Sequence, residues 1–195
     1  MSIKRFNDYD TVKAYSDFPV LPRGGYVMEI KGATPQSSQN GDYIKIALDI
    51  KEGEYAGFYE KEYASQSGTD RKWRCHYLLN VPKDDGSERD DWSKRSFKTF
   101  TAALEESNPG YLFDWEEDHF KGLLIGGLFN MREYEKSDGS IGKATNMARV
   151  TTVEKIRKGD YTIPNDTLLK GSGSRSGSGD DFMDAPSGIS EELPF

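Results

Sequence analysis

The sequence predicts a mainly β protein: a five-stranded antiparallel barrel with one inserted helix, followed by a disordered acidic C-terminal tail. Three observations lead to this fold class. The stretch "YIKIALDI" at 43–50 alternates apolar residues with the period of a strand that has one buried face. The stretch "FKTFTAAL" at 97–104 places its large apolar residues at helical spacing. The run "GSGSRSGSG" at 171–179 has the composition of a flexible linker, so the acidic segment after it stands outside the folded body.

The N-terminal half of the body predicts strands separated by turns. Proline and a glycine pair at 22–25 mark a turn, after which a strand is expected over 26–31. The polar turn "QSSQNGD" leads into the alternating strand. The stretch "KEGEYAGFYEKEYA" at 51–64 has glycines between aromatic residues, which predicts a turn followed by a curved or bulged strand.

The C-terminal half predicts one helix and a final hairpin. A helix is expected over 92–107, which Asp91 or Ser93 can cap and which "SNPG" ends. The remainder predicts an apolar strand (121–134), a hairpin turn (135–142), a returning strand (143–156) and an ordered extension (157–169).

Four or five strands with a helix between the third and the fourth favour a small closed barrel, because closure removes exposed strand edges. This plan matches the five-stranded OB-fold, and an α+β sandwich is the alternative. The predicted organisation is an OB-fold-like domain (1–170), a Gly/Ser linker (171–180) and an acidic protein-interaction tail (181–195).

Charge and composition limit the function classes. The formal charge of the chain is −7, of which residues 171–195 carry −4, so the body carries −3. A nucleic-acid surface would therefore have to come from local clustering of cations. A single cysteine excludes an internal disulfide and favours a reducing cytoplasm. Neither a signal-like apolar start nor a run of membrane-spanning length is present, so we expect no membrane association.

Catalytic groups are sparse. His76, His119 and Cys75 stand in no motif of nucleophilic catalysis, and two histidines cannot assemble a zinc-type ligand set. The acidic stretch "DWEEDHF" at 114–120 could bind a divalent metal, although neighbouring acids usually form a solvated turn. A phosphate-binding GxxxxGK[ST] loop is absent. We therefore expect no enzyme activity, no cofactor and no metal site.

Aromatic residues interleaved with cations are better represented. Single-stranded nucleic acid is held by aromatic faces that stack on bases, beside cations that follow the phosphates. The stretches "RKWRCHY" and "WSKRSFK" have this composition, and the later hairpin adds similar residues. The predicted DNA-binding residues are Arg71, Lys72, Trp73, Arg74, Tyr77, Lys94, Arg95, Arg132, Tyr134 and Arg149. The stretch "GFYEKEY" offers a further cluster, whereas Phe97 and Phe100 lie on the apolar stripe of the helix and are expected in the core.

The tail is predicted to be a segment that binds other proteins. Beyond the linker, acids are mixed with isolated apolar residues, and the last three residues are Leu-Pro-Phe. A terminal phenylalanine can enter a small apolar pocket while basic residues of the partner pair with the carboxylate and the acids. The predicted protein-interaction residues are Asp184, Glu191, Glu192, Leu193, Pro194 and Phe195.

The segment "DDFMDAPSGISEELPF" resembles the C-terminal tip of bacterial single-stranded DNA-binding proteins, which have an OB-fold body, a Gly-rich linker and an acidic tip ending in Pro-Phe. The stretches "LPRGGYVMEI", "DIKEGEYAGFY", "ESNPGY" and "IRKGDY" resemble phage-encoded proteins of Gram-positive hosts that are regarded as replication-associated single-strand binders. The tip departs from the bacterial pattern, because "APSGIS" splits its acids and Leu193 replaces the usual isoleucine. Both changes can retune docking onto partners.

The resemblance implies sequence-independent binding of single-stranded DNA in the host cytoplasm, with the tail recruiting replication, recombination or repair enzymes. It leaves a homo-oligomer open. Two other interpretations of the residues also stay open. One is an acidic adaptor or inhibitor that mimics nucleic acid and has no DNA affinity, and the other is a metal-dependent nuclease built on the carboxylates of 114–118.

Overall fold

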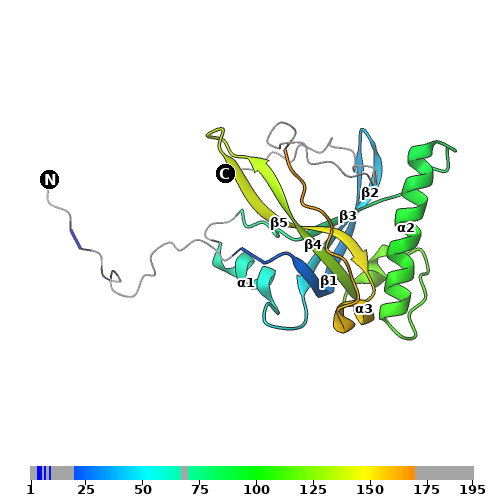
Figure 1. Cartoon of the computed structure of the whole chain (residues 1–195), viewed down its shortest axis with the longest axis horizontal. Helices are drawn as coiled ribbons and strands as arrows, with labels where there is room; N and C mark the ends of the chain where they lie inside the picture. The colour runs from blue at the N-terminus through cyan, green and yellow to red at the C-terminus, as the bar shows by residue number, and fades with distance from the viewer. Residues whose placement is uncertain (1–3, 6, 8, 10–19, 67–69, 170–195) are drawn as a thin grey trace.

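The structure, a computed structural model, describes residues 4, 5, 7, 9, 20–66 and 70–169 (Figure 1). Its elements are β1 (Gly24–Ser38), β2 (Gly41–Ile50), α1 (Phe58–Ser65), β3 (His76–Asn80), α2 (Glu88–Ser107), the 3-10 helix η1 (Glu117–Phe120), β4 (Leu124–Glu135), β5 (Ile141–Thr151) and α3 (Val153–Lys158). The predicted linker and acidic tail lie outside the described residues. Within the described residues, no helix combines the length and the apolar character needed to cross a membrane.

The five strands form one antiparallel sheet in the order β3-β2-β1-β4-β5. In sequence, α2 is inserted between β3 and β4, and in space it contacts both β3 and β5, the two outer strands of the sheet. The β1–β2 hairpin and the β4–β5 hairpin diverge from each other at the upper end of the molecule in Figure 1. This arrangement confirms the predicted mainly β, OB-like plan with one helix between the third and fourth strands.

The core lies between the sheet and α2. The four isoleucine and leucine residues at alternate positions of β2 are buried, as the period of two predicted, and they pack with residues of α2 such as Phe100 and Leu104. Each fully buried side chain of this kind stabilises the fold by roughly 1.5–3 kcal/mol. The residues between them, such as Lys45 and Ala47, therefore point to the opposite face of the sheet.

The turn predicted at the start of 51–64 is present, but the strand predicted after it is wrong, because Phe58–Ser65 forms helix α1. The residue before the helix, Gly57, has a positive φ of 71° and no side chain with which to cap the helix. The cap comes instead from Asp49 at the end of β2, whose carboxylate accepts the N–H groups of Tyr59 (2.9 Å) and Glu60 (3.3 Å). A cap supplied by a residue nine positions before the start of the helix leaves no local signal that sequence reasoning can use.

Other boundaries also differ from the prediction. Strand β1 extends over Gly24–Ser38 rather than 26–31, because it pairs with β2 as far as Ser38. Helix α2 begins at Glu88 rather than at 92, because Ser87 accepts the N–H of Asp90 and so caps the helix earlier than Asp91 or Ser93 could. The returning strand ends at Thr151, and α3 follows it, capped by Thr152. The extension after α3 runs back along β4, where Thr167 forms a parallel bridge with Arg132.

Asp49 is 1% exposed, so removing its carboxylate leaves buried N–H groups without an acceptor. We expect Asp49→Ala to lower the free energy of unfolding by about 2–3 kcal/mol, measured by urea denaturation. The matched control is Asp85→Ala, since that carboxylate accepts the N–H of Ser87 in an exposed loop, and its removal should leave the free energy of unfolding nearly unchanged. An equal decrease in the free energy of unfolding in both variants would show that the Asp49 cap has no special role.

Candidate nucleic-acid interface

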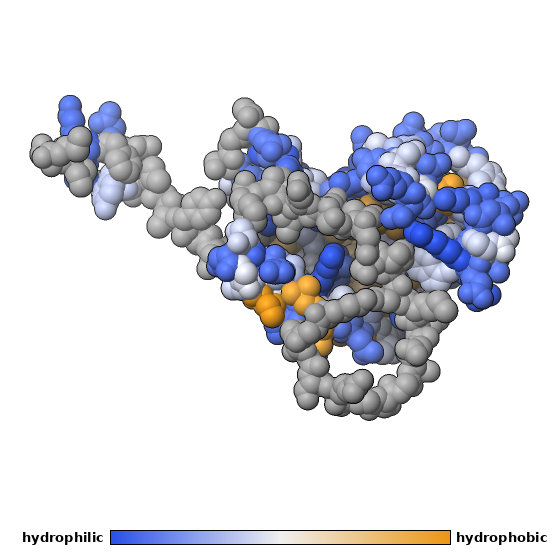
Figure 2. Space-filling view, turned by 90° about the horizontal axis from the view of Figure 1, so that it is seen from above, coloured by the Kyte–Doolittle hydropathy of each residue, from blue (hydrophilic) through white to orange (hydrophobic). Residues whose placement is uncertain are grey.

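An open hollow of about 520 Å³ lies over β1, β2 and β3. Its lining residues are Lys31, Gly32, Thr34, Gln36, Lys45, Ala47, Tyr63, Arg71, Trp73 and His76. The strand residues among them belong to the face of the sheet that points away from α2, because they alternate with the buried residues of the core. In a view from above, the described surface is mostly hydrophilic, with small apolar areas (Figure 2).

Two of the strand residues that line the hollow, Gly32 and Ala47, are small, and we call these two neighbouring positions its floor. Gly32 of β1 lies opposite Ala47 of β2, which in turn lies opposite His76 of β3. A Cβ atom added to Gly32 would meet nothing within 4 Å, so the space above this position is open. At this position the sheet therefore borders the open space of the hollow.

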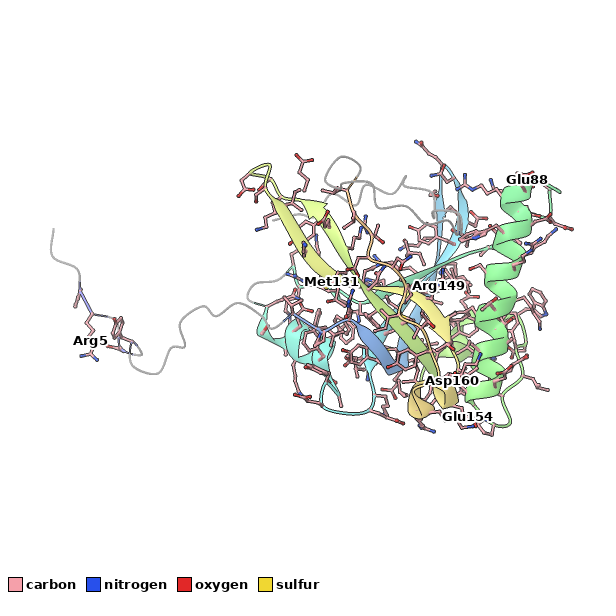
Figure 3. All side chains as sticks on the ribbon, in the orientation of Figure 1. Arg5, Glu88, Met131, Arg149, Glu154 and Asp160 are labelled. Atoms are coloured by element: carbon pink, nitrogen blue, oxygen red, sulfur yellow. The ribbon has the colours of Figure 1, made fainter. Side chains whose placement is uncertain are left out.

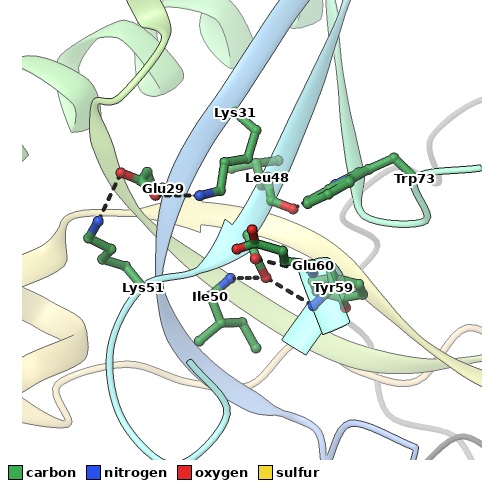
Figure 4. A network of polar contacts seen from close by, with 9 residues as sticks. Glu29, Lys31, Leu48, Ile50, Lys51, Tyr59, Glu60 and Trp73 are labelled. Carbon is green, nitrogen blue, oxygen red and sulfur yellow. Dashed lines mark hydrogen bonds and ion pairs between the residues drawn. The ribbon is translucent and has the colours of Figure 1, made fainter. Parts of the chain in front are cut away.

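Two aromatic rings from different elements form one wall. Tyr63 comes from α1 and Trp73 from the segment after it, and their ring centroids are 5.7 Å apart with the planes tilted by 44°. The indole Nε1–H of Trp73 donates to the carbonyl of Leu48 on β2 (2.9 Å), which fixes the orientation of the ring (Figure 4). The guanidinium of Arg71 lies 4.9 Å from the centroid of the Tyr63 ring, within cation–π range. The wall is thus held in place before any ligand arrives.

Helix α1 also holds the segment that carries Trp73. The side chain of Gln66, just after the helix, donates to the carbonyl of Lys72 and accepts from its N–H, both at 2.8 Å. Arg74 forms an ion pair of 3.2 Å with Glu62 of α1, which is 8% exposed. Burial raises the pKa of the Glu62 carboxyl, and the charge of Arg74 opposes that rise. The cations of this segment are therefore positioned by the helix that Asp49 caps.

The charge of the hollow is opposite to that of the chain. Among the ten described residues that line it, three are cations and none is a carboxylate. Lys72 and Arg74 flank Trp73 and add two further cations beside the wall. The whole chain carries a formal charge of −7, so this concentration of cations is local. Local clustering of cations is the arrangement that nucleic-acid binding by an acidic protein would require.

The structure brings together only part of the predicted DNA-binding set. Arg71 and Trp73 line the hollow, and Lys72 and Arg74 adjoin it. Tyr77 lies on the other face of β3, one residue after His76, where it stacks on Phe100 of α2 at 5.8 Å. Burial raises the pKa of the Tyr77 hydroxyl, as expected for a ring in the core.

The other predicted cations and Tyr134 lie on elements that do not line the hollow. Lys94 pairs with Asp84 and Asp90 at the start of α2, and the exposed Arg95 follows it on the same helix. Arg132 and Tyr134 belong to β4, and the exposed Arg149, labelled in Figure 3, belongs to β5. A role for these residues in DNA binding stays a prediction.

Sequence reasoning missed most of the sheet residues of the hollow. Lys31, Lys45 and Ala47 come from strands whose pairing no local pattern specifies. One signal was present, since the alternation at 43–50 that assigns the isoleucines to the core also assigns Lys45 and Ala47 to the opposite face. Tyr63 belongs to the stretch "GFYEKEY", which was noted for its composition only.

The acidic stretch at 114–118 forms a separate surface. Asp114 accepts a hydrogen bond from His119 at 2.7 Å, and Trp115 beside it is 78% exposed, with its ring stacked on Phe97. Within the described residues, no group of three or more histidine, cysteine or acidic side chains is arranged to hold a metal ion. Cys75 is buried, and burial raises the pKa of its thiol, which makes it a poor nucleophile.

A scan of the chain against protein-family models finds no matching family, and a search of curated proteins finds no matching protein.

The Asp114–His119 pair gives a prediction for pH. The hydrogen bond to Asp114 raises the pKa of His119, so the pair stabilises the fold below the usual histidine pKa of 6.5 and loses that contribution as the pH rises through the raised value. An NMR titration should place the pKa of His119 above 6.5 in the wild type and bring it back in Asp114→Asn. An unshifted His119 in the wild type would contradict the pair.

Proposed function

We propose that this protein binds single-stranded DNA without sequence preference and takes part in DNA replication or recombination, in the setting of a phage-infected cell. The observation that carries the proposal is the hollow over β1–β3, in which a fixed aromatic wall stands beside three cations and no carboxylate. Stacking surfaces next to cations are the two components that sequence-independent binding of single strands uses.

The geometry indicates how a strand would be held. A base that lies over the small residues of the floor can stack on Trp73, which lines the hollow and whose ring is fixed by its bond to Leu48. The phosphates on either side would lie near Arg71, Lys31 and Lys45. Paired bases in a duplex are stacked on each other and cannot reach the wall, so the hollow favours single strands.

The acidic tail is proposed to recruit partner enzymes of replication, recombination or repair. Its sequence, with Glu191 and Glu192 before Leu193, Pro194 and Phe195, supports this role through the chemistry of a terminal apolar ring beside acids. The tail carries the same sign of charge as DNA, so it would not strengthen DNA binding. Recruitment and DNA binding are thus assigned to different parts of the chain.

A protein-binding adaptor is the second candidate. The surface around Trp115 favours it, because residues 99–120 contain six acids and no lysine or arginine, while Leu112 and Trp115 are each 78% exposed. An exposed apolar pair surrounded by acids suits a cationic protein partner and repels phosphates. This surface lies apart from the hollow and is compatible with the first proposal.

The wall gives a matched pair of substitutions. Trp73→Ala should weaken binding of a fluorescein-labelled oligo-dT by about 1–3 kcal/mol, the usual contribution of one stacked aromatic ring, whereas Trp115→Ala should leave it unchanged. Anisotropy titrations at low salt would measure both. Gly32→Leu is the second test, since a Cβ atom there meets nothing within 4 Å and the added side chain would occupy the floor and weaken binding. Full affinity in both Trp73→Ala and Gly32→Leu would exclude the hollow as the DNA site.

The tail gives an independent prediction. Deleting residues 188–195 removes Glu191, Glu192 and the terminal Leu-Pro-Phe. We expect oligo-dT affinity to stay equal or rise, because acids that repel phosphates are lost, while binding to a partner enzyme is abolished. Anisotropy and a pull-down with the host replication helicase or recombination enzymes would measure the two effects. A marked loss of DNA affinity would show that the tail is part of the DNA site.

A further inference from the structure

Glu29 of β1 holds two lysines at once, one on each carboxylate oxygen. The Nζ of Lys31 lies 2.7 Å from Oε2, and the Nζ of Lys51 lies 2.9 Å from Oε1 (Figure 4). The Glu29 side chain is 19% exposed, while those of Lys31 and Lys51 are 36% and 49% exposed. Hydrogen bonds from the two lysines lower the pKa of Glu29, so its carboxylate is ionised at neutral pH.

Only one of the two lysines reaches the hollow. The register between β1 and β2 shifts between Ile30 and Gly32, so Lys31 sits in a bulge and lines the hollow beside Gly32. Lys51 follows the end of β2, where its N–H bonds to Val27 at 2.8 Å, and it is not among the lining residues. The two lysines therefore share one carboxylate but differ in their access to a ligand.

The charges around Lys31 allow a phosphate to replace Glu29 as its ion-pair partner. Glu29 is its direct partner, and the charges of Asp49 and Glu60 lie further away. Lys31 is itself partly exposed, and ion pairs of exposed lysines contribute little to stability, so a phosphate in the hollow can compete for Lys31. When Lys31 leaves, Glu29 keeps Lys51 and is not left as a partly buried carboxylate without a cation, which would be costly.

We propose that Glu29 and Lys51 regulate the DNA affinity of the hollow. Glu29 binds Lys31 in the absence of DNA, and Lys51 allows Glu29 to release Lys31 to a phosphate of the bound strand. Lys31 is the residue that contacts the strand. Lys51 is a positioning residue, because it stays paired with Glu29 when Lys31 moves from Glu29 to the phosphate. Glu29 lowers the affinity for DNA as long as it holds Lys31. The proposal rests on the proposed binding of single-stranded DNA by this hollow.

The test is a double-mutant cycle on oligo-dT affinity, read by anisotropy over a series of salt concentrations. Lys31→Met should weaken binding and reduce the slope of log K against log salt by about 0.7, the value for one lost phosphate contact on a single strand. Glu29→Gln should tighten binding by about two- to five-fold, in line with the strength of an exposed ion pair. Lys51→Met should weaken binding by a similar factor, because Glu29 then retains Lys31 more strongly.

The decisive comparison is Lys51→Met in the Glu29→Gln background, where its effect should disappear. A simple loss of one positive charge would instead weaken binding by the same factor in both backgrounds, and that result would overturn the proposal. Glu154→Gln and Lys158→Met are the charge-matched controls, since this pair on α3 has the same composition and does not line the hollow. Both controls should bind as the wild type does.

The outcomes also distinguish a failure of the Lys31 release mechanism from a failure of the proposed DNA-binding function. If the wild type binds oligo-dT and Lys31→Met leaves the salt slope unchanged, Lys31 meets no phosphate and the release mechanism is wrong while the DNA-binding function stands. If the wild type itself does not bind oligo-dT at low salt, the proposed function fails and the release mechanism fails with it.

Discussion

The buried carboxylate of Asp49 is the constraint on which the rest of the site depends. It closes the end of β2 and accepts the first N–H groups of α1, which fixes that helix against the sheet. The helix then supplies Tyr63 to the aromatic wall and holds the segment that carries Trp73. The neighbouring carbonyl of Leu48 fixes the Trp73 ring directly. Consecutive residues of one strand thus serve the core, the helix cap and the wall of the hollow.

The two faces of β2 explain how one small sheet can carry the core on one side and the hollow on the other. Residues that point toward α2 are apolar and buried, while Lys45 and Ala47 between them form part of the hollow. The acidic residues that give the chain its negative charge lie elsewhere, chiefly in residues 99–120 and in the tail. None of the ten residues that line the hollow is a carboxylate, and the carboxylates nearest to it, Glu29 and Glu62, are each paired with a cation, Lys31 and Arg74 respectively. An acidic protein can in this way present a locally cationic surface without a positive net charge.

The sequence predicted those parts of the molecule whose signals are local. The alternation at 43–50 and the apolar stripe of α2 identified a strand and a helix, and their order led to the OB-like plan. Helix α1 was missed because its cap, Asp49, comes from another element. At the site, "RKWR" was found because its cations and Trp73 are adjacent in sequence. Lys31 and Gly32 could not be found, since only the pairing of β1 with β2 brings them to the hollow.

The most direct test of the central claim is a titration of labelled oligo-dT with the full chain at two salt concentrations, with duplex DNA of equal length as competitor. The account predicts tight binding that the duplex does not displace, and an affinity that falls with salt by a slope of about −0.7 per neutralised phosphate. Absence of binding at low salt, or an affinity independent of salt, would contradict the claim that the hollow over β1–β3 is a site for single-stranded DNA.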